Sequence, residues 1–516
     1  MWTIKLLLTT LILVECNAYK ILLWCPLPSG SHGILGDAFV NIFLNAGHEV
    51  TYISSMTKMS PVPKVNIIDV SSNAKVYPDE LLNITSIMEG MSDMTQDDYF
   101  FPIIDELSLV TLQNEDVQKL LNDESQHFDV VIAEWMYNDV YAGLAALYEC
   151  PLIWFSSLEP HWLVLKTIDE PLNPAYNPDS MSAKVVPFTF LQRVEELWLQ
   201  LSRGFFREFW TYKDVTKIYN DIFSPLLTKR GRALPSYEEV RYNGSMMLGN
   251  SHAVLGQPTR LPQNYRAIGG FHIGKNVKPL PENLKRIMDG AKHGVIYFSM
   301  GSNLRSVDYP PEIKKGLLKM FGKLKQTVLW KFEEKFDNVP SNVHILKWAP
   351  QQSILAHPNC VMFITHCGAL STNEAIHFGV PIIGIPVFVD QFVNAARAVA
   401  KGFGKKVELD YGLVDNLKAA IDDVLSTSSY REKVKELSAI YHDRPITPQQ
   451  EILYTVEHVI RTKGARYLRS PALMVSWYQK MYLDLLALII VVIILIIISI
   501  RYLLRLISKK NKSKSD

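Results

Sequence analysis

Cysteine is scarce in this sequence, and its spacing excludes the sites that cysteine usually builds. The chain has five cysteines in 516 residues, and no two of them are separated as C-x-x-C or combined with histidine at metal-ligand spacing. Cys16 falls in an apolar N-terminal stretch, whereas Cys25, Cys150 and Cys360 lie beside apolar runs. We expect those three to be buried free thiols, and no spacing predicts a disulfide for them or for Cys367.

An excess of one charge is also missing. The sequence has 53 Lys and Arg against 52 Asp and Glu, a formal net charge of +1, so nothing in its composition indicates a nucleic-acid partner. No internal repeat or low-complexity block stands out. Gly30, Gly33 and Gly36 imitate a dinucleotide-binding fingerprint only loosely, because the G-x-G-x-x-G spacing is absent. This absence, with no ribose-binding acid after the second predicted strand, argues against a nucleotide-dependent oxidoreductase.

The sequence does contain enough apolar material for two domains, since 48% of its residues are apolar and 20% are charged. Its first elements are predicted to be a strand, a loop, a helix and a strand over 19–25, 26–33, 34–46 and 49–53. His32 lies in that predicted loop, at the carboxyl end of the first strand, where open α/β sheets bind their ligands. A loop histidine suits proton removal from a hydroxyl near neutral pH, although bonding to the backbone is the simpler role for one considered alone.

A second α/β pattern lies in the C-terminal half. The apolar run 361–365 predicts a buried strand, and 380–386 predicts the next one. Between them Ser371 and Glu374 have the S-x-x-E spacing of a capping box, so we expect a helix to begin at Ser371 and to end at Gly379. The N-terminus of that helix would point into the crevice at the strand ends, where its dipole attracts phosphate.

The same segment carries side chains suited to a nucleotide sugar. It offers, in order, an aromatic face for stacking a base, donors for phosphate, an acceptor for ribose hydroxyls, and a polar pair for sugar hydroxyls. These are Trp348, then His366 with Ser371, then Glu374, then Asp390 with Gln391. Each residue also has a structural explanation, such as helix capping or core packing, so the ordered set is more informative than any single member.

Residues 348–391 resemble the nucleotide-sugar signature of the UDP-glycosyltransferase family. The matching motifs are, in order, W-x-P-Q, H-P, F-I-T-H-x-G, S-x-x-E-A, G-V-P-I and D-Q. The resemblance implies that the Trp stacks on uracil, the Gln contacts the base, the His and adjacent turn hold diphosphate, the Glu binds ribose, and the Asp-Gln pair binds the sugar. These roles fall on Trp348, Gln351, His366, Gly368, Ser371, Glu374, Asp390 and Gln391. Cys367 departs from the Gly of many animal members.

The resemblance extends to the first half of the chain. P-S-G-S-H, ending at His32, is similar to the context of the family's general base. Such a base is oriented by a carboxylate on its other ring nitrogen. The family usually has Asp at one strand end, whereas this chain has Glu134 after the predicted strand 128–133, with Asp139 five residues on. Both carboxylates remain candidates. The F-S-x-G-S loop implies a diphosphate contact for Ser302.

Both ends of the chain carry membrane-related patterns. Residues 1–18 have the features of a signal peptide, and 483–500 are apolar enough for a transmembrane helix followed by a basic cytoplasmic tail, 501–516. We therefore expect a type I protein of the endoplasmic reticulum membrane, with its catalytic domains in the lumen and a K-x-K-x-x-like C-terminus. Asn83 and Asn243 begin sequons in the lumenal part and are predicted glycosylation sites.

For the fold, the resemblance implies the GT-B architecture, in which two Rossmann-like α/β domains face a cleft. We expect an acceptor-binding domain over 19–274, a linker over 275–283, a UDP-sugar-binding domain over 284–450, and return helices over 451–482. The aromatic stretch 150–260 is expected to be mainly core and helix packing, with part of it lining a pocket for lipophilic acceptors.

For the activity, the resemblance implies inverting transfer of a hexose from a UDP-sugar to the hydroxyl of a small lipophilic acceptor, with His32 as the base. The sequence has no D-x-D pair, so we expect metal-independent donor binding, and no cofactor beyond the donor is implied. Glucose is favoured over glucuronic acid because small similarities lean toward invertebrate members. The alternative is a UDP-sugar-binding membrane protein that has lost catalysis, for which Glu134 is the one argument. A homo-oligomer is compatible with the sequence. The sequence identifies neither the oligomeric state nor the acceptor.

Overall fold

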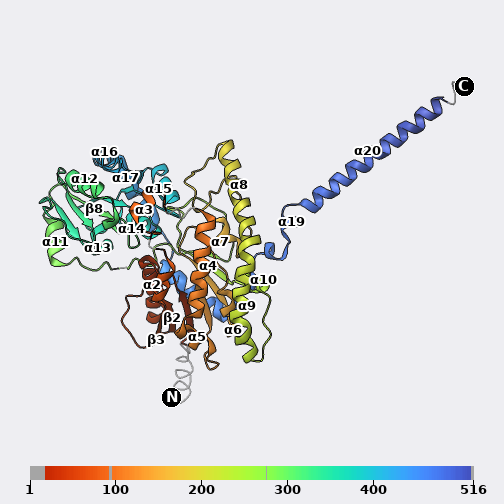
Figure 1. The fold of residues 1–516 in the computed structure, drawn as a ribbon, viewed down its shortest axis with the longest axis horizontal. Helices are drawn as coiled ribbons and strands as arrows, with labels where there is room; N and C mark the ends of the chain where they lie inside the picture. The colour runs from red at the N-terminus through yellow and green to blue at the C-terminus, as the bar shows by residue number, and fades with distance from the viewer. Residues whose placement is uncertain (1–17, 79, 92–95, 275, 513–516) are drawn as a thin grey trace, which may run out of the picture.

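Two parallel sheets organise the chain in the computed structural model, which describes residues 18–78, 80–91, 96–274 and 276–512 (Figure 1). The first sheet has the strand order β3-β2-β1-β4-β5-β6-β7. Its strands are β1 (Lys20–Cys25), β2 (Glu49–Ser54), β3 (Val65–Asp69), β4 (Val130–Glu134), β5 (Leu152–Ser156), β6 (Met246–Gly249) and β7 (Tyr265–Ala267). The second has the order β10-β9-β8-β11-β12-β13. Its strands are β8 (Val295–Ser299), β9 (Thr327–Lys331), β10 (Val343–Leu346), β11 (Cys360–Thr365), β12 (Ile382–Gly384) and β13 (Gly404–Lys406).

Both sheets have the same topology. In each, the chain forms a central strand, adds two strands to one side, and then returns to extend the other side. This is the strand order of Rossmann domains, and the register is parallel at every pair. Apolar residues of β1 alternate between two cores, with Leu22 and Trp24 on one face and Ile21 and Leu23 on the other. The predicted pair of Rossmann-like α/β domains is confirmed.

Helices cover both faces of each sheet. In the first domain they are α2 (Gly30–Asn45), η1 (Ser71–Val76), α3 (Ile84–Met88), α4 (Asp97–Gln113), α5 (Glu115–Asn122), α6 (Ala142–Tyr148), α7 (Trp162–Lys166), α8 (Phe190–Phe206), the π-helical η2 (Arg207–Thr211), α9 (Tyr212–Lys229) and α10 (Tyr237–Arg241). In the second domain they are α11 (Glu282–Asp289), η3 (Ser306–Asp308), α12 (Pro311–Phe321), α13 (Gln351–Leu355), α14 (Ala369–Phe378), α15 (Gln391–Ala400), α16 (Leu413–Ser426) and α17 (Ser428–His442).

Two helices begin earlier than the sequence predicts. α2 begins at Gly30, so His32 lies in its first turn and not in a loop. α14 begins at Ala369 with Gly368 as its N-cap, and the expected capping box is wrong: Ser371 lies inside the helix and caps nothing. The preceding turn explains this, because it delivers the chain into the helix two residues before the S-x-x-E pattern. The predicted end is correct, since α14 stops at a left-handed glycine.

The chain crosses between the domains twice. The first crossing follows β7 and reaches α11 at Glu282, so the last residues of the predicted linker are helical. The second leads from α17 to α18 (Pro448–Arg461), whose apolar side joins the core around β1 in the first domain. The crossings are hydrogen-bonded to each other: Arg444 Nη2 donates to the Gly269 carbonyl at 3.0 Å, and Gln449 Nε2 donates to the Phe271 carbonyl at 2.8 Å.

The C-terminal segment leaves the globular part of the protein (Figure 1). It contains η4 (Arg466–Leu468), η5 (Pro471–Met474), α19 (Trp477–Lys480) and α20 (Leu483–Lys512). Residues Leu483–Ile507 are long and apolar enough to cross a membrane and are not buried against the rest of the described chain. This span is longer than the predicted 483–500, because α20 continues through Arg501 and Arg505. The predicted signal peptide lies, except for Ala18, outside the described residues.

The aromatic stretch 150–260 divides into two kinds of environment. Trp154 and Phe155 of β5 are fully buried, as expected for core. On α8 the expectation of core packing is wrong, because Phe190 and Trp198 are 70% and 71% exposed.

The four described cysteines and the two sequons can also be placed. Cys25, Cys360 and Cys367 are buried and Cys150 is half-buried, all as free thiols. Asn83 precedes α3 at the domain boundary, and its side chain accepts a hydrogen bond from the Ser86 backbone N–H; Asn243 is exposed beside β6. Of the two predicted glycosylation sites, Asn243 therefore has the more accessible side chain in the folded chain.

Candidate active site

The loops and helix ends that follow the strands of the two sheets meet between the domains. Ser29, before α2, donates a hydrogen bond from its Oγ to Asn303 Oδ1 after β8, at 2.9 Å. A Cβ built on Gly30 would come within 2.9 Å of Ser302 Cβ, so the two loops touch and only a glycine fits at this point. Ser302, a predicted diphosphate contact, is exposed here, beside the first turn of α2. The meeting point lies at the strand ends where doubly wound sheets bind ligands.

His32 and Glu134 form a hydrogen-bonded pair in this region. The Nδ1 atom of His32 lies 2.5 Å from Oε1 of Glu134, the last residue of β4. Burial lowers the pKa of His32, but the charge and hydrogen bond of Glu134 and the charge of Asp390 together raise it above its ordinary value. The Glu134 carboxylate is buried, and its Oε2 has no hydrogen-bond partner among the described residues. The pair therefore leaves Nε2 of His32 as the ring nitrogen available for proton transfer.

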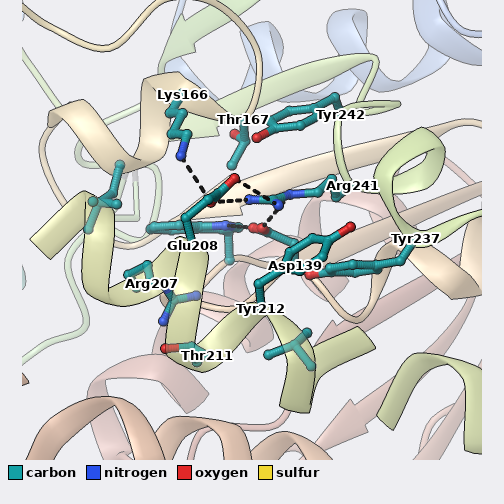
Figure 2. A pocket seen from close by; sticks show the side chains of 14 residues that line it. Asp139, Lys166, Thr167, Arg207, Glu208, Thr211, Tyr212, Tyr237, Arg241 and Tyr242 are labelled. Carbon is teal, nitrogen blue, oxygen red and sulfur yellow. Dashed lines mark hydrogen bonds and ion pairs between the residues drawn. The ribbon is translucent and has the colours of Figure 1, made fainter. Parts of the chain in front are cut away.

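Asp139, the other carboxylate proposed for His32, belongs to a different polar cluster. Trp135 Nε1 donates to its Oδ1 at 2.5 Å, and Arg241 Nε lies 3.7 Å from its Oδ2. Figure 2 shows this cluster, in which Arg241 reaches both Asp139 and Glu208, and Lys166 also contacts Glu208. The geometry thus favours Glu134 over Asp139 as the partner of His32.

The turn between β11 and α14 holds the ring of His366 between two glycines. A Cβ on Gly301 would lie 2.5 Å from Cε1 of His366, and one on Gly368 would lie 2.5 Å from its Nε2. Burial and the nearby charge of Lys331 lower the pKa of His366 to about 4. His366 is therefore neutral near pH 7, and its imidazole has one N–H to donate at the N-terminus of α14.

Cys367 has a left-handed backbone conformation, with φ at 64°. Glycine adopts this conformation without steric cost, so the glycine that the family resemblance leads us to expect here would also fit this backbone. The Cys367 carbonyl accepts a hydrogen bond from Asn394 Nδ2 at 3.0 Å. The same Asn394 nitrogen donates to Asp390 Oδ2 at 2.7 Å, so one side chain joins the β11–α14 turn to the start of α15.

Asp390 and Gln391 lie at the beginning of α15, in different roles. Burial raises the pKa of Asp390 to about 6, opposed by its hydrogen bond from Asn394 and by the charge of His32. Gln391 is buried, and its Oε1 accepts the backbone N–H groups of Val387 and Phe388 at 2.8 and 3.3 Å. Asp390 thus faces the region of His32, while the Gln391 carbonyl oxygen fixes the turn before α15.

Glu374 is the centre of a buried network. Its Oε2 accepts from Gln351 Nε2 at 2.7 Å, and its Oε1 accepts from Gln352 Nε2 at 3.0 Å. His272 of the first domain lies 3.2 Å from the same Oε1, and Gln351 also reaches Ser371 Oγ at 3.3 Å. The structure therefore brings Gln351, Ser371 and Glu374 together, and it adds two further partners for the carboxylate.

Trp348 is 56% exposed, and one face of its ring is covered by a cation. Lys58 Nζ from the first domain lies 3.4 Å from the ring centroid. The Lys58 loop is fixed to α2, because Asp37 accepts hydrogen bonds from Thr57 Oγ1 at 2.7 Å and from the Lys58 backbone N–H at 3.2 Å. A base that stacks on Trp348 must displace the lysine or use the opposite face.

Four residues at the site were not identified from the sequence. Asn394 follows Asp390 by one helical turn, so the D-x-x-x-N spacing on a predicted helix could have indicated it. Gln352 directly follows the W-x-P-Q motif. His272 and Lys58 lie in loops of the first domain, and no local pattern relates them to residues more than a hundred positions away. Their roles depend on how the domains face each other.

The sequence is similar to known proteins over nearly its whole length. The family model described as "UDP-glucoronosyl and UDP-glucosyl transferase" matches residues 20–514. The chain is 31% identical to UDP-glucosyltransferase 2 of Dactylopius coccus over 96% of this chain and 95% of that protein. It is 33% identical to UDP-glycosyltransferase UGT5 of the same species, over 94% and 91%. It is 28% identical to UDP-glucuronosyltransferase 2B10 of Homo sapiens, over 93% of each.

Solved structures share the fold at lower identity. The calicheamicin glycosyltransferase CalG4 superposes with a TM-score of 0.55 at 16% identity, covering 86% of this chain and 99% of that one. The glycotransferase of kitacinnamycin gives a TM-score of 0.54 at 17% identity, with the same coverages. These likenesses concern the fold alone, and they confirm the predicted GT-B architecture.

Proposed function

The chain belongs to the UDP-glucoronosyl and UDP-glucosyl transferase family and is a glycosyltransferase, and we propose that it transfers a hexose from a UDP-sugar to a hydroxyl of a small lipophilic acceptor with inversion. The observation that carries the proposal is the His32–Glu134 pair, which lies where the two domains meet and near Asp390 of the segment that carries the donor motif. A base oriented by a carboxylate, next to a nucleotide-sugar site, is the arrangement that such a transfer requires.

In the proposed reaction, Nε2 of His32 takes the proton of the acceptor hydroxyl while Glu134 stabilises the imidazolium that forms. The acceptor oxygen attacks the anomeric carbon of the sugar from the face opposite UDP. The bond between that carbon and the diphosphate oxygen breaks, and UDP leaves with the electron pair. An α-linked donor therefore gives a β-glycoside. The raised pKa of His32 suits this role, because it makes the imidazole a stronger base near neutral pH.

The leaving diphosphate needs charge stabilisation, which we assign to the N-terminus of α14 with the His366 imidazole, Ser302 and Ser371. Backbone N–H groups and the helix dipole at Gly368 favour an anion. This assignment needs no metal ion. We further assign uracil stacking to Trp348, contact with the base to Gln351, ribose hydroxyls to Glu374, and sugar hydroxyls to Asp390 and Gln391.

Glucose is the sugar that we propose. Its support is that the two Dactylopius relatives, one of them printed as a glucosyltransferase, are 31% and 33% identical, against 28% for UDP-glucuronosyltransferase 2B10. Glucuronic acid differs from glucose at C6, and we assign no residue to the recognition of that position. The argument from relatives is associational, so the sugar has to be identified by experiment.

α20 associates the protein with a membrane. We propose that it spans the endoplasmic reticulum membrane as a type I anchor, with both domains in the lumen. The support is that the sequence has, in this order, an N-terminal segment with the features of a signal peptide, two globular domains, an apolar span and a basic C-terminus.

The test uses membranes from cells that express the full chain. They are incubated with UDP-glucose or UDP-glucuronic acid and a panel of phenols and alcohols, and product masses are measured. His32→Ala is the test variant, and the matched control is His127→Ala, an exposed histidine three residues before β4 and so beyond the opposite end of that strand from Glu134.

We expect a glucose adduct that is lost in His32→Ala and kept in His127→Ala. A glucuronide lost only in His32→Ala would overturn the choice of sugar and keep the mechanism. An adduct retained in His32→Ala would overturn the role of His32. Binding of UDP without any adduct, over a widened acceptor panel, would instead support a binding protein that has lost catalysis.

A further inference from the structure

Helix α8 is amphipathic in the reverse of the usual sense. The side chains that it turns toward the protein are polar: Glu196, Gln200 and Arg203 are 0%, 7% and 3% exposed. They are spaced four and three residues apart and therefore share one face of the helix. A surface helix of a globular protein normally buries its apolar face and leaves its polar face in water.

The buried polar face is fully engaged, so the orientation of α8 is fixed by specific bonds. Glu196 accepts from the Asp179 backbone N–H at 2.9 Å and from Ser182 Oγ at 2.6 Å. Arg203 forms ion pairs with Asp179 at 2.5 Å and with Asp97 at 2.7 Å. Rotating the helix to bury its apolar side would leave these charges without partners in the interior, at a cost of several kcal/mol.

The apolar side of α8 and the adjoining η2 is consequently exposed. Its members recur at three- and four-residue spacing and are between 47% and 71% exposed. They are Phe190, Leu191, Val194, Leu197, Trp198, Leu201, Phe205 and Phe209. Full burial of one such side chain is worth about 1.5–3 kcal/mol. Soluble monomers rarely leave a continuous apolar surface of this kind in water, so we expect this surface to be covered by another molecule or by lipid.

We propose that this face of α8 lies in the interfacial layer of the same bilayer that α20 crosses. α8 lies on the side of the first domain from which α19 and α20 leave (Figure 1). Just before α20, Met474, Trp477 and Tyr482 are 89%, 71% and 69% exposed, as suits a segment at the membrane interface. A helix with Trp, Phe and Leu on one face and polar groups on the other is typical of interfacial helices.

The tether strengthens the argument for lipid over a second protein. Because α20 holds the domains at the membrane, the bilayer surface is present at a high effective concentration without any association step. A helix of 17 residues is about 26 Å long and can lie in the headgroup layer while its charged face stays bound to the protein. The membrane contact thus consists of a spanning helix and a second, interfacial helix in the first domain. This inference does not depend on the proposed transfer reaction.

The test uses the full chain reconstituted in phosphatidylcholine vesicles. A nitroxide is attached to Leu201→Cys on the exposed face of α8 and, as a matched control, to Lys315→Cys on exposed α12 of the second domain. The labelled unsubstituted chain gives the background from native thiols. Collision rates with apolar oxygen and with a water-soluble nickel complex are compared by electron paramagnetic resonance.

We expect the Leu201 label to collide with oxygen several-fold more than with the nickel complex, and the Lys315 label to show the opposite preference. Adding Trp198→Glu should shift the Leu201 label toward the nickel complex, while leaving the circular dichroism spectrum in detergent unchanged. A Leu201 label that is as accessible to nickel as the Lys315 label would overturn the proposal. Shielding from both reagents with spin–spin broadening would also overturn it, and would identify a second copy of the chain as the occupant.

Discussion

Replacing Glu134 by Gln tests how the buried carboxylate acts on His32. The substitution keeps the size of the side chain and removes its charge at a position that is 2% exposed and 2.5 Å from Nδ1. The glutamine amide can still bond the ring. When its N–H donates to Nδ1, however, the proton of the neutral imidazole lies on Nε2, and Nε2 then cannot take the proton of the acceptor hydroxyl. We expect kcat/KM to fall by about 10²–10⁴, which corresponds to about 3–5 kcal/mol of transition-state stabilisation.

The pH profile gives a second, independent readout. Burial lowers the pKa of His32, and the Glu134 charge is the main reason that the folded value is nevertheless raised. Without that charge, burial dominates and the pKa falls below its ordinary value of about 6.5. The acidic limb of kcat/KM should therefore move to lower pH in Glu134→Gln while the plateau drops. For stability the sign follows from the raised pKa: protonated His32 stabilises the wild-type fold below the unfolded pKa, and this contribution is lost as the pH rises through the folded pKa.

The assay is initial-rate transfer to one acceptor from the panel at saturating UDP-sugar, from pH 5 to pH 9. Glu312→Gln, an exposed glutamate on α12, is the matched control and should leave both the plateau and the limb unchanged. A Glu134→Gln variant with wild-type activity, or one whose plateau drops while its acidic limb stays in place, would refute the role of Glu134 as the group that tunes His32.

Four further outcomes follow from the donor side of the site. Trp348→Ala should weaken UDP binding in calorimetry by about 1–3 kcal/mol if the ring stacks on the base; unchanged affinity would show that it does not. Lys58→Ala should strengthen the same binding by about 0.5–1 kcal/mol, because the cation no longer competes for the ring; weaker binding would mean that Lys58 contacts the donor itself. Gly368→Ala should reduce UDP affinity while preserving the circular dichroism spectrum, since its Cβ would displace the His366 ring. Across these variants, the contribution of His366 should not titrate between pH 6 and 8, because its pKa of about 4 keeps it neutral.

The parts of the candidate site that the sequence could indicate are those encoded by contiguous sequence. The turn and helix after β11 are specified by apolar runs and by glycines whose positions are restricted by close approach, such as Gly368 beside His366. His32 was identified, although not its place in a helix, because three small residues before it hide the start of α2. Glu134 and Asp139 could not be separated, since both follow the same strand and only the direction of each side chain distinguishes them.

What the sequence did not predict depends on contacts between distant segments. The Lys58–Trp348 contact and the approach of His272 to Glu374 arise from the arrangement of the two domains, which no local periodicity encodes. The orientation of α8 was missed for a related reason. Apolar spacing alone indicates a buried face, and only the ion pairs of Arg203 with Asp97 and Asp179 show that the polar face is the inner one.

The two crossings between the domains have a mechanical consequence. They lie side by side, joined by the Arg444–Gly269 and Gln449–Phe271 hydrogen bonds, and together they form a two-strand hinge. Two parallel strands resist twisting and sliding far more than one does, so the remaining soft motion is a rotation about the line on which they lie. Opening along that arc separates Ser29 from Asn303, which are hydrogen-bonded to each other across the domains. Such an opening also has to break other interdomain contacts, including Lys58 with Trp348 and Thr85 with the Asp308 carbonyl, and the paired crossings favour the same register when the domains close again.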